Sequence, residues 1–281
     1  MSIRELYQRY TNQLSTIYSS HEAGELSLWL MEHFLGIRRI DLLQNKKIGE
    51  IPLGMKQALE ALMRQEPIQY ILGKAPFYGR EFRVSPAVLI PRNETEELVH
   101  LIIKENTIPN PSILDIGTGS GCIPISLALE IPEARVAALD ISEEALEVAK
   151  ENAKDLRANI DFYQTDILKD AIPVDNLDII VSNPPYVKYS EKELMQPNVL
   201  EHEPHLALFV YDEDPLIFYR EIAIKAKISL KTGGKLYLEI NEGLGKETAN
   251  LLATIGYQQV QIHQDLNGKD RMISATSNRN E

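Results

Sequence analysis

The 281-residue sequence contains one cysteine, Cys122, one tryptophan and no long apolar run. With a single cysteine no disulfide can form within the chain, so the composition gives no sign of an oxidising compartment. No stretch approaches the ~20 apolar residues of a membrane-spanning helix, and the first ten residues mix both charge signs where a signal peptide would be apolar. We therefore expect a soluble, unprocessed protein of the cytoplasm.

Positive charge is also scarce. The 29 lysines and arginines are outnumbered by 41 aspartates and glutamates, which gives a formal net charge of −12. A protein that binds many phosphates needs a positive net charge, so nucleic acid is disfavoured as a partner. Hydrophobic residues make up 44% and charged residues 25%, as is usual for globular chains. The length predicts one large domain, or one domain with a small companion.

The first part of the chain predicts a small all-helical domain over residues 1–70. Across residues 52–66 apolar side chains recur every three or four positions, which is the spacing of one helical face, and Pro67 ends the pattern. Similar but weaker periodicity occurs earlier, for example over residues 25–35. We expect a small bundle with Trp29 in its core.

A change of pattern marks the linker, which we place at residues 71–92. Glycine-punctuated, β-branched and aromatic stretches replace the helical periodicity, and residues 77–84 are typical of a hairpin. A helix is then expected over 94–106, before the two prolines of 109–111 break the chain. The second domain is placed at residues 93–281.

From residue 112 onward, strand-like and helix-like segments alternate, which is typical of a doubly wound parallel sheet. The expected strands are 113–116, 135–139, 160–164, 177–181, 235–240, 257–264 and 272–275. The expected helices are 122–130, 143–156, 215–230 and 244–255. Because no helix separates the last two strands, we expect them to form an antiparallel hairpin.

A glycine-rich turn follows the first strand of this domain. Asp115 ends the strand, and the turn Gly117-Thr118-Gly119-Ser120-Gly121 leads into a helix. Glycines allow a tight turn and bring a ligand close to the free amides of a helix N-terminus, as in nucleotide-binding loops. A dinucleotide fingerprint would need a further glycine where Cys122 stands, which weakens a hydride-transfer interpretation. A glycine-rich turn alone could also be a simple connector.

Carboxylates follow the second and third strands. Asp140 lies 19 residues beyond Gly121, where a carboxylate can accept hydrogen bonds from both hydroxyls of a ribose. Asp166 could accept a hydrogen bond from an adenine amino group, with Ile167 as an apolar cover, although a polar strand end without function explains these two equally well. The turn and Asp140 together predict a ligand that contains adenosine. S-adenosylmethionine is favoured over NAD because it has no pyrophosphate and its ammonium could lie near Asp115, but spacing alone does not decide between them.

The fourth strand runs into the tetrapeptide Asn183-Pro184-Pro185-Tyr186. Ligands bind at the carboxyl ends of parallel strands, so this tetrapeptide is expected to face the same crevice as the glycine turn. An amide or aromatic amine is a poor nucleophile, and the side-chain oxygen of Asn183 and the carbonyl of Pro184 would accept its protons. The prolines set the carbonyl direction, and Tyr186 would lie against the flat face of the substrate group. We expect catalysis by positioning and electrostatic support, because asparagine is not a strong base.

These features resemble class I S-adenosylmethionine-dependent amino-group methyltransferases, which act on adenine, cytosine or glutamine amide nitrogens. Four further stretches make the chain similar to the HemK/PrmC protein-glutamine methyltransferases: 69–73, 88–96, 203–208 and 265–271. That family methylates the glutamine of the Gly-Gly-Gln loop in class 1 peptide chain release factors. The resemblance extends over about residues 67–275 and implies a Rossmann-like sheet with an antiparallel last strand. The helical region is similar to the family's release-factor-binding domain.

The resemblance also implies roles for individual residues. The cofactor would contact Gly117, Thr118, Gly119, Ser120, Gly121, Asp140, Ile167 and Asn183. The substrate glutamine would lie against Asn183, Pro184, Pro185 and Tyr186. Pro91 and Arg92, with the segment Glu94-Thr95-Glu96, would lie on the loop beside the target peptide.

The chain departs from the family pattern at a few positions. These positions are Asn93, 210–212, Asn241 and Leu244. They leave the methyl-transfer site intact and affect the geometry of the substrate loops.

Other functions are less well supported. Residues 201–205 place histidines and glutamates together, but the proline among them does not suit a tetrahedral metal site, so we expect no metal and a substrate-covering loop. The main alternative is N6-adenine methylation of DNA or RNA, against which the net charge argues. A cofactor-binding sensor would not need residues 183–186, and a dehydrogenase ranks last.

Overall fold

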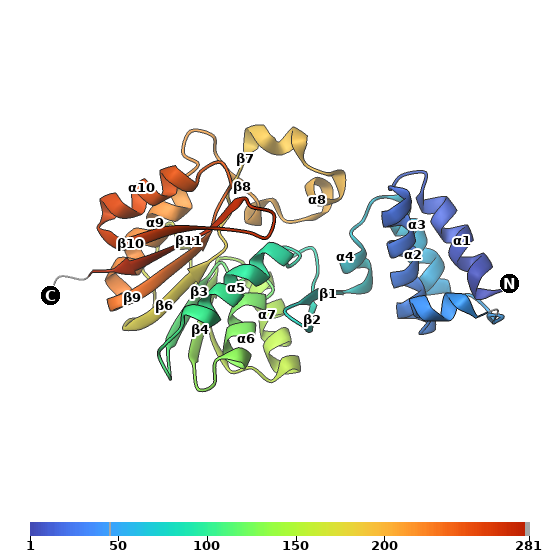
Figure 1. Ribbon diagram of the computed structural model, residues 1–281, viewed down its shortest axis with the longest axis horizontal. Coiled ribbons are helices and arrows are strands. Elements are labelled where there is room, and N and C mark those ends of the chain that lie inside the picture. Colours follow the sequence, from blue (N-terminus) through green and yellow to red (C-terminus); the bar gives the residue numbers. More distant parts are fainter. Residues whose placement is uncertain (45, 279–281) are drawn as a thin grey trace. The chain divides into compact units, whose positions relative to one another are not determined.

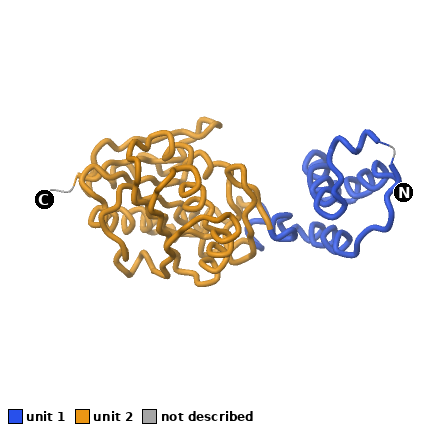
Figure 2. Tube along the Cα trace, turned by 90° about the horizontal axis from the view of Figure 1, so that it is seen from below, with its two compact units in different colours: residues 1–73, 196–202 blue, residues 74–195, 203–281 orange. Residues whose placement is uncertain are grey.

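The computed structural model describes residues 1–44 and 46–278 (Figure 1). The chain divides into two compact units, which Figure 2 distinguishes by colour: Met1–Gly73 with Gln196–His202, and Lys74–Met195 with Glu203–Glu281. The hairpin that we assigned to a linker falls within the second unit, and the domain boundaries expected from the sequence stay a prediction. Among the described residues, no helix is both long and apolar enough to cross a membrane.

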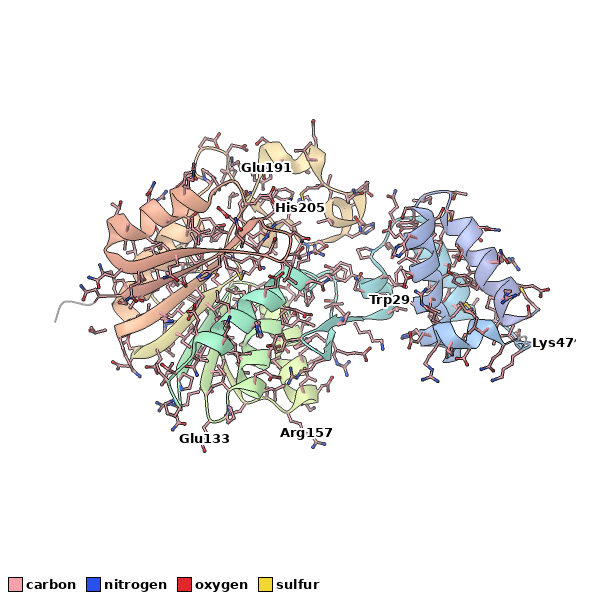
Figure 3. All side chains as sticks on the ribbon, viewed as in Figure 1. Trp29, Lys47, Glu133, Arg157, Glu191 and His205 are labelled. Carbon is pink, nitrogen blue, oxygen red and sulfur yellow. The ribbon has the colours of Figure 1, made fainter. Side chains whose placement is uncertain are left out.

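The first unit is all helical, as predicted. Its elements are α1 (Ile3–Leu14), α2 (Ser20–Leu35), the 3₁₀ helix η1 (Arg39–Leu43), α3 (Leu53–Met63), α4 (Ile68–Leu72) and α8 (Pro197–His202). A capping box begins α1, because Ser2 and Glu5 each accept a hydrogen bond from the other's backbone N–H. The left-handed Gly36 ends α2. Trp29, labelled in Figure 3, packs against the core of this unit.

A seven-stranded sheet forms the centre of the second unit, in the order β10-β11-β9-β6-β3-β4-β5. Its strands are β3 (Ser112–Ile116), β4 (Arg135–Asp140), β5 (Ile160–Gln164), β6 (Leu177–Ser182), β9 (Leu230–Glu239), β10 (Tyr257–Gln264) and β11 (Asp270–Ser277). The pairs from β9 to β5 are parallel, whereas β11 runs antiparallel to both β9 and β10. The predicted doubly wound sheet with a closing antiparallel hairpin is confirmed. Only β9 begins clearly earlier than predicted.

Helices cover both faces of this sheet. They are α5 (Asn93–Glu105), α6 (Cys122–Glu130), α7 (Glu143–Leu156), α9 (Ile217–Ser229) and α10 (Gly245–Ile255). Neighbouring strand residues point to opposite faces, so Ile113 and Ile179 pack with α5, α6 and α7, whereas Leu114 and Ile180 pack with α9 and α10. Burial on both faces explains why these strands are nearly continuous apolar runs in the sequence.

Several short elements complete the unit. The strands β1 (Lys74–Phe77) and β2 (Arg80–Arg83) form a hairpin whose turn residues, Tyr78 and Gly79, both have positive φ. The hairpin begins at Lys74, three residues before the start of the predicted hairpin at 77–84. Between β6 and α9 lie β7 (Val187–Lys188), η2 (Tyr189–Leu194), η3 (His205–Ala207) and β8 (Phe209–Val210), of which the sequence predicted none.

The buried Asn152 of α7 joins the hairpin to the glycine turn. Its side-chain oxygen accepts a hydrogen bond from the backbone N–H of Arg83 at 2.7 Å. Its amide nitrogen donates to the carbonyl oxygens of Arg83 and Ser120 at 3.0 and 2.9 Å. One side chain thus satisfies backbone groups of two segments that are distant in the sequence.

We expect Asn152→Ala to lower the free energy of unfolding by about 2–4 kcal/mol, because backbone groups left without partners cost ~1–3 kcal/mol each. Urea unfolding of the purified protein measures this change. The exposed Glu151 on the same helix provides the control, since Glu151→Ala should alter stability by no more than ~0.5 kcal/mol. Equal stability of the two variants would contradict the assigned role.

Candidate active site

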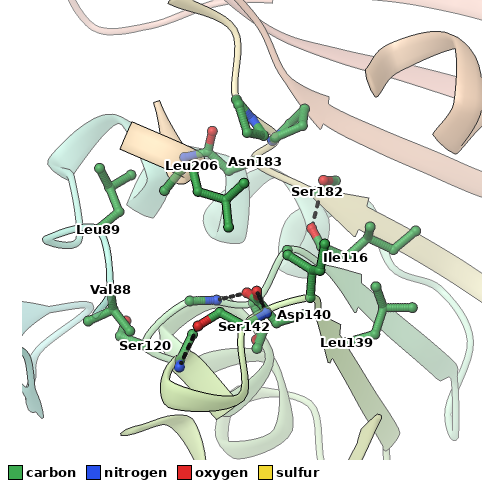
Figure 4. Close-up of a pocket in the computed structure, with 18 of the residues that line it drawn as sticks. Val88, Leu89, Ile116, Ser120, Leu139, Asp140, Ser142, Ser182, Asn183 and Leu206 are labelled. Carbon is green, nitrogen blue, oxygen red and sulfur yellow. Dashed lines mark hydrogen bonds between the residues drawn. The ribbon is translucent and has the colours of Figure 1, made fainter. Parts of the chain in front are cut away.

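A cavity of about 390 Å³ lies at the carboxyl ends of the parallel strands, within the roughly 300–1,000 Å³ of small-molecule sites. Its lining includes the glycine turn after β3, Asp140 at the end of β4, residues 165–168 after β5, and residues 182–185 at and just beyond the end of β6. In Figure 4, Asp140 and Asn183 border the same hollow. The expected meeting of the strand ends at one crevice is therefore observed.

The three glycines of the turn are required for two different structural reasons. Gly117, Gly119 and Gly121 have φ angles of 75°, 53° and 79°. A Cβ atom on Gly117 or Gly119 would meet no atom within 4 Å, and both residues line the cavity, so a ligand can approach their backbone. A Cβ on Gly121 would lie 3.0 Å from Ile125 and 3.1 Å from Ala149. Gly121 therefore permits close packing of α6 and α7.

Two hydroxyls of the turn indicate a polar ligand. The side-chain oxygens of Thr118 and Ser120 are buried, line the cavity, and have no hydrogen-bond partner within the described chain. Buried polar atoms are normally satisfied, so these hydroxyls are suited to groups that a ligand brings. They lie just before the N-terminus of α6, which favours an anionic group such as a carboxylate. The residues present thus fit an amino-acid-containing nucleoside cofactor.

The carboxylate of Asp140 holds the turn in place. It accepts hydrogen bonds from the backbone N–H groups of Gly119 at 2.8 Å and Ser142 at 3.0 Å. Burial raises its pKa, and these backbone bonds oppose that rise. Asp166 also lines the cavity, and its ion pair with Lys169, at 2.9 Å, lowers its pKa.

Most of the predicted site residues are brought together. Those that line the cavity are Arg92, Gly117, Thr118, Gly119, Ser120, Asp140, Asp166, Ile167, Asn183, Pro184 and Pro185. Those that do not line it are Glu94, Asp115, Gly121 and Tyr186. Asp115 is fully buried inside β3, and the ring of Tyr186 packs against the core on the α9 and α10 face. The expected place of Tyr186 against a substrate stays a prediction.

A buried carboxylate that the sequence did not single out lies behind Asn183. The amide nitrogen of Asn183 donates to the Thr95 hydroxyl at 3.2 Å, and that hydroxyl donates to Glu239 at 2.7 Å. The other oxygen of Glu239 accepts a hydrogen bond from the Tyr186 hydroxyl at 3.0 Å. Burial raises the pKa of Glu239, while the two hydroxyls and the charge of Arg271 oppose that rise. The only sequence signal was a charged residue at the end of an apolar strand.

A second buried carboxylate joins two walls of the cavity. Glu203, whose side chain is 1% exposed, accepts hydrogen bonds from the Arg92 guanidinium at 2.6 Å and from the backbone N–H of Ile90 at 3.2 Å. Arg92 lines the cavity on one side, and Pro204 and Leu206 line it on the other. The segment expected to be a substrate-covering loop is thus fastened to the segment that carries Arg92.

The buried Asp115 makes stability depend on pH. Burial raises its pKa to about 7, from 3.8 for an ordinary aspartate; the negative charge of Asp140 adds to that rise, and the neighbouring Thr118 hydroxyl opposes it. Between these values the folded protein holds a proton that the unfolded chain has released. Since the unfolded state then binds fewer protons, the free energy of unfolding falls as the pH rises from about 4 to about 7.

We expect Asp115→Asn to remove this contribution, which is at most about 1.4 kcal/mol per pH unit. Urea unfolding at pH 5, 6 and 7, without added ligand, measures the slope for the wild type and the variant. Parallel slopes would show that Asp115 does not carry the proton.

Comparisons with known proteins match segments of both units. The family model of the PrmC N-terminal domain matches residues 5–73, and that of the methyltransferase small domain matches residues 95–206. Similarity is high to the release factor glutamine methyltransferase of Bacteroides thetaiotaomicron, with 48% identity over 93% of this chain and 95% of the relative. The enzyme of that name from Flavobacterium psychrophilum is 45% identical over 97% of this chain and 98% of its own length.

The fold has relatives among solved structures. A methyltransferase from Pyrococcus furiosus superposes with a TM-score of 0.55 and 17% identity, covering 80% of this chain and all of the other. This likeness concerns the fold alone, whereas the sequence relatives identify the family. The resemblance inferred from the motifs is confirmed: the chain belongs to the HemK/PrmC family of S-adenosylmethionine-dependent release factor glutamine methyltransferases.

Proposed function

We propose that this chain transfers the methyl group of S-adenosylmethionine to the side-chain amide nitrogen of the glutamine in the Gly-Gly-Gln loop of class 1 peptide chain release factors. The observation that carries the proposal is that Asn183 and Pro184 line the same cavity as the glycine turn. The release factor is then the protein partner, and the cytoplasm, where translation ends, is the place of action. The helices of the first unit would bind the partner.

The cofactor would be held by residues of the three strand ends. The unpartnered hydroxyls of Thr118 and Ser120, with the amides at the start of α6, would bind its carboxylate. Asp140 would accept hydrogen bonds from the ribose hydroxyls, because each carboxylate oxygen can accept more than one. Asp166 would bind the adenine amino group, and Ile167 would cover the ring.

The cofactor supplies a methyl group on a positively charged sulfur, which keeps the bonding electrons when the methyl leaves. The substrate amide nitrogen is a weak nucleophile, so the protein has to hold its plane and face it toward the methyl carbon. The Asn183 oxygen and the Pro184 carbonyl would accept its two N–H groups and stabilise the positive charge that develops on nitrogen. One amide proton is then released to water.

The cavity walls would position the peptide around the glutamine. Arg92 and Glu94 would lie beside the target loop, with Arg92 kept in place by its ion pair to the buried Glu203. Pro185 borders the cavity next to the two acceptors, whereas Tyr186 supports the tetrapeptide from behind through Glu239. The net charge of −12 opposes adenine in a nucleic acid as the substrate.

We expect Asp140→Ala to weaken binding of S-adenosylmethionine about 10- to 100-fold, the loss that follows from ~1.5–3 kcal/mol of hydrogen bonds to a charged group. Titration calorimetry measures the affinity. Asp161→Ala, which removes an exposed carboxylate from β5, should bind like the wild type. Unchanged affinity of the Asp140 variant would remove this residue from the cofactor site.

We expect labelled methyl to appear on the glutamine of a release factor and not on duplex DNA when both are offered together. Asn183→Ala should lower kcat by about 10²–10³-fold, the usual loss of one charge-stabilising hydrogen-bond partner, with cofactor affinity largely retained. Mass spectrometry of the products and calorimetry of the variant measure both effects.

The exposed Asn159 gives a matched control, since Asn159→Ala removes the same side chain far from the cavity lining. Label on the DNA alone would establish the adenine alternative. Normal turnover by the Asn183 variant would exclude its oxygen as a required acceptor.

A further inference from the structure

We propose that Thr95 is a positioning residue that fixes which end of the Asn183 amide faces the substrate, and that Glu239 in turn fixes the proton of Thr95. The inference rests on the proposed function, because it concerns the acceptor that would bind the substrate amide. Asparagine can offer an acceptor or a donor, depending on a 180° turn of its amide. Only the orientation with the oxygen toward the cavity can accept a proton from a substrate N–H.

The sheet register brings these groups together. In the parallel pair of β6 and β9, Ser182 lies opposite Leu238, so the following residues, Asn183 and Glu239, come next in register. Both belong to the face of the sheet that α5 covers, since alternate residues share a face. Thr95 lies in the first turn of α5 and is 3% exposed. It stands between the two side chains and contacts both.

With Glu239 present as the carboxylate, which only accepts hydrogen bonds, the inventory of donors and acceptors permits one direction only. Each oxygen of the buried Glu239 accepts from one hydroxyl, that of Thr95 at 2.7 Å and that of Tyr186 at 3.0 Å. A hydroxyl has a single proton, so Thr95, having donated to Glu239, can only accept from Asn183. The 3.2 Å contact between Thr95 and Asn183 therefore uses the NH₂ group of the amide. The Asn183 oxygen is left for the cavity.

The same set of donors and acceptors disfavours the reverse orientation of the Asn183 amide. A turned amide would place its oxygen against the Thr95 oxygen, with no proton between two acceptors. Thr95 and Glu239 are buried, and a buried acceptor that faces a second acceptor is unfavourable, so a turned amide would be a minor population. Without the Thr95 hydroxyl this contact no longer selects the orientation of the Asn183 amide. A substrate would then meet the amide oxygen in some molecules and the NH₂ group in others. The chain from Glu239 to Asn183 thus prepares the acceptor before the substrate arrives.

Substitutions at Thr95 test this inference through kcat, the KM for a release factor and the affinity for S-adenosylmethionine. Thr95→Val keeps the shape and removes the hydroxyl, so we expect kcat to fall about 10-fold or more while cofactor affinity changes less than about 3-fold. Thr95→Ser restores the hydroxyl and should recover most of the wild-type kcat. Thr95→Ala, which also lacks the hydroxyl, replaces the valine variant if that protein does not fold. Thr107→Val, at an exposed threonine, is the matched control.

Combination with Asn183→Ala separates positioning from general loss of structure. If Thr95 acts through the Asn183 amide, adding Thr95→Val to Asn183→Ala lowers kcat no further. The inference would be overturned if the kcat losses of the two single variants multiplied in the double variant, or if Thr95→Val were as active as the wild type. In both cases the wild type still methylates the release factor, so the proposed function would stand. A wild type that binds cofactor but transfers no methyl to the release factor would overturn the proposed function, and this inference with it.

Discussion

Parallel pairing of β3, β4, β6 and β9 is the constraint on which the site depends. Because the register of each pair brings the carboxyl ends to one edge of the sheet, residues that follow different strands become neighbours there. Gly117 and Asn183 directly follow a strand, Asp140 is the last residue of one, and all three line one cavity. The helices on both faces keep that edge in place, and α5 also contributes a side chain to it.

Helices and strands of the second unit could be predicted where the sequence signal for the element lies within or beside it. The predicted helices at α6 and α7 begin and end where the structure has them, since Gly121 adopts a left-handed turn before the first and Ser142 caps the second. The helix α4 and the two-residue strands β7 and β8 are too short for periodicity to show. The β7 and β8 pair also joins segments that are separated by a long connection.

The site residues, too, were predictable only where the sequence signal is local. Asp140 and Asn183 could be found because each directly follows a predicted strand. The family resemblance placed Thr95 beside the target peptide, but its contact with Glu239 could not be predicted, since the two residues are 144 positions apart and meet only through tertiary packing. Positions that depart from the family pattern also have roles visible only in the fold. Asn241 donates to the Tyr186 carbonyl at 3.2 Å, and Asp212 accepts from the Ser190 N–H at 3.1 Å.

The bonds from Gly119 and Ser142 to Asp140 have a consequence for ligand entry. They brace the glycine turn by contacts within the protein alone. A ligand therefore meets a preorganised cradle, and the entropy of ordering that loop has already been lost during folding. Association can then be quick and its strength can come from the contacts themselves, because the carboxylate already braces the loop from within the protein.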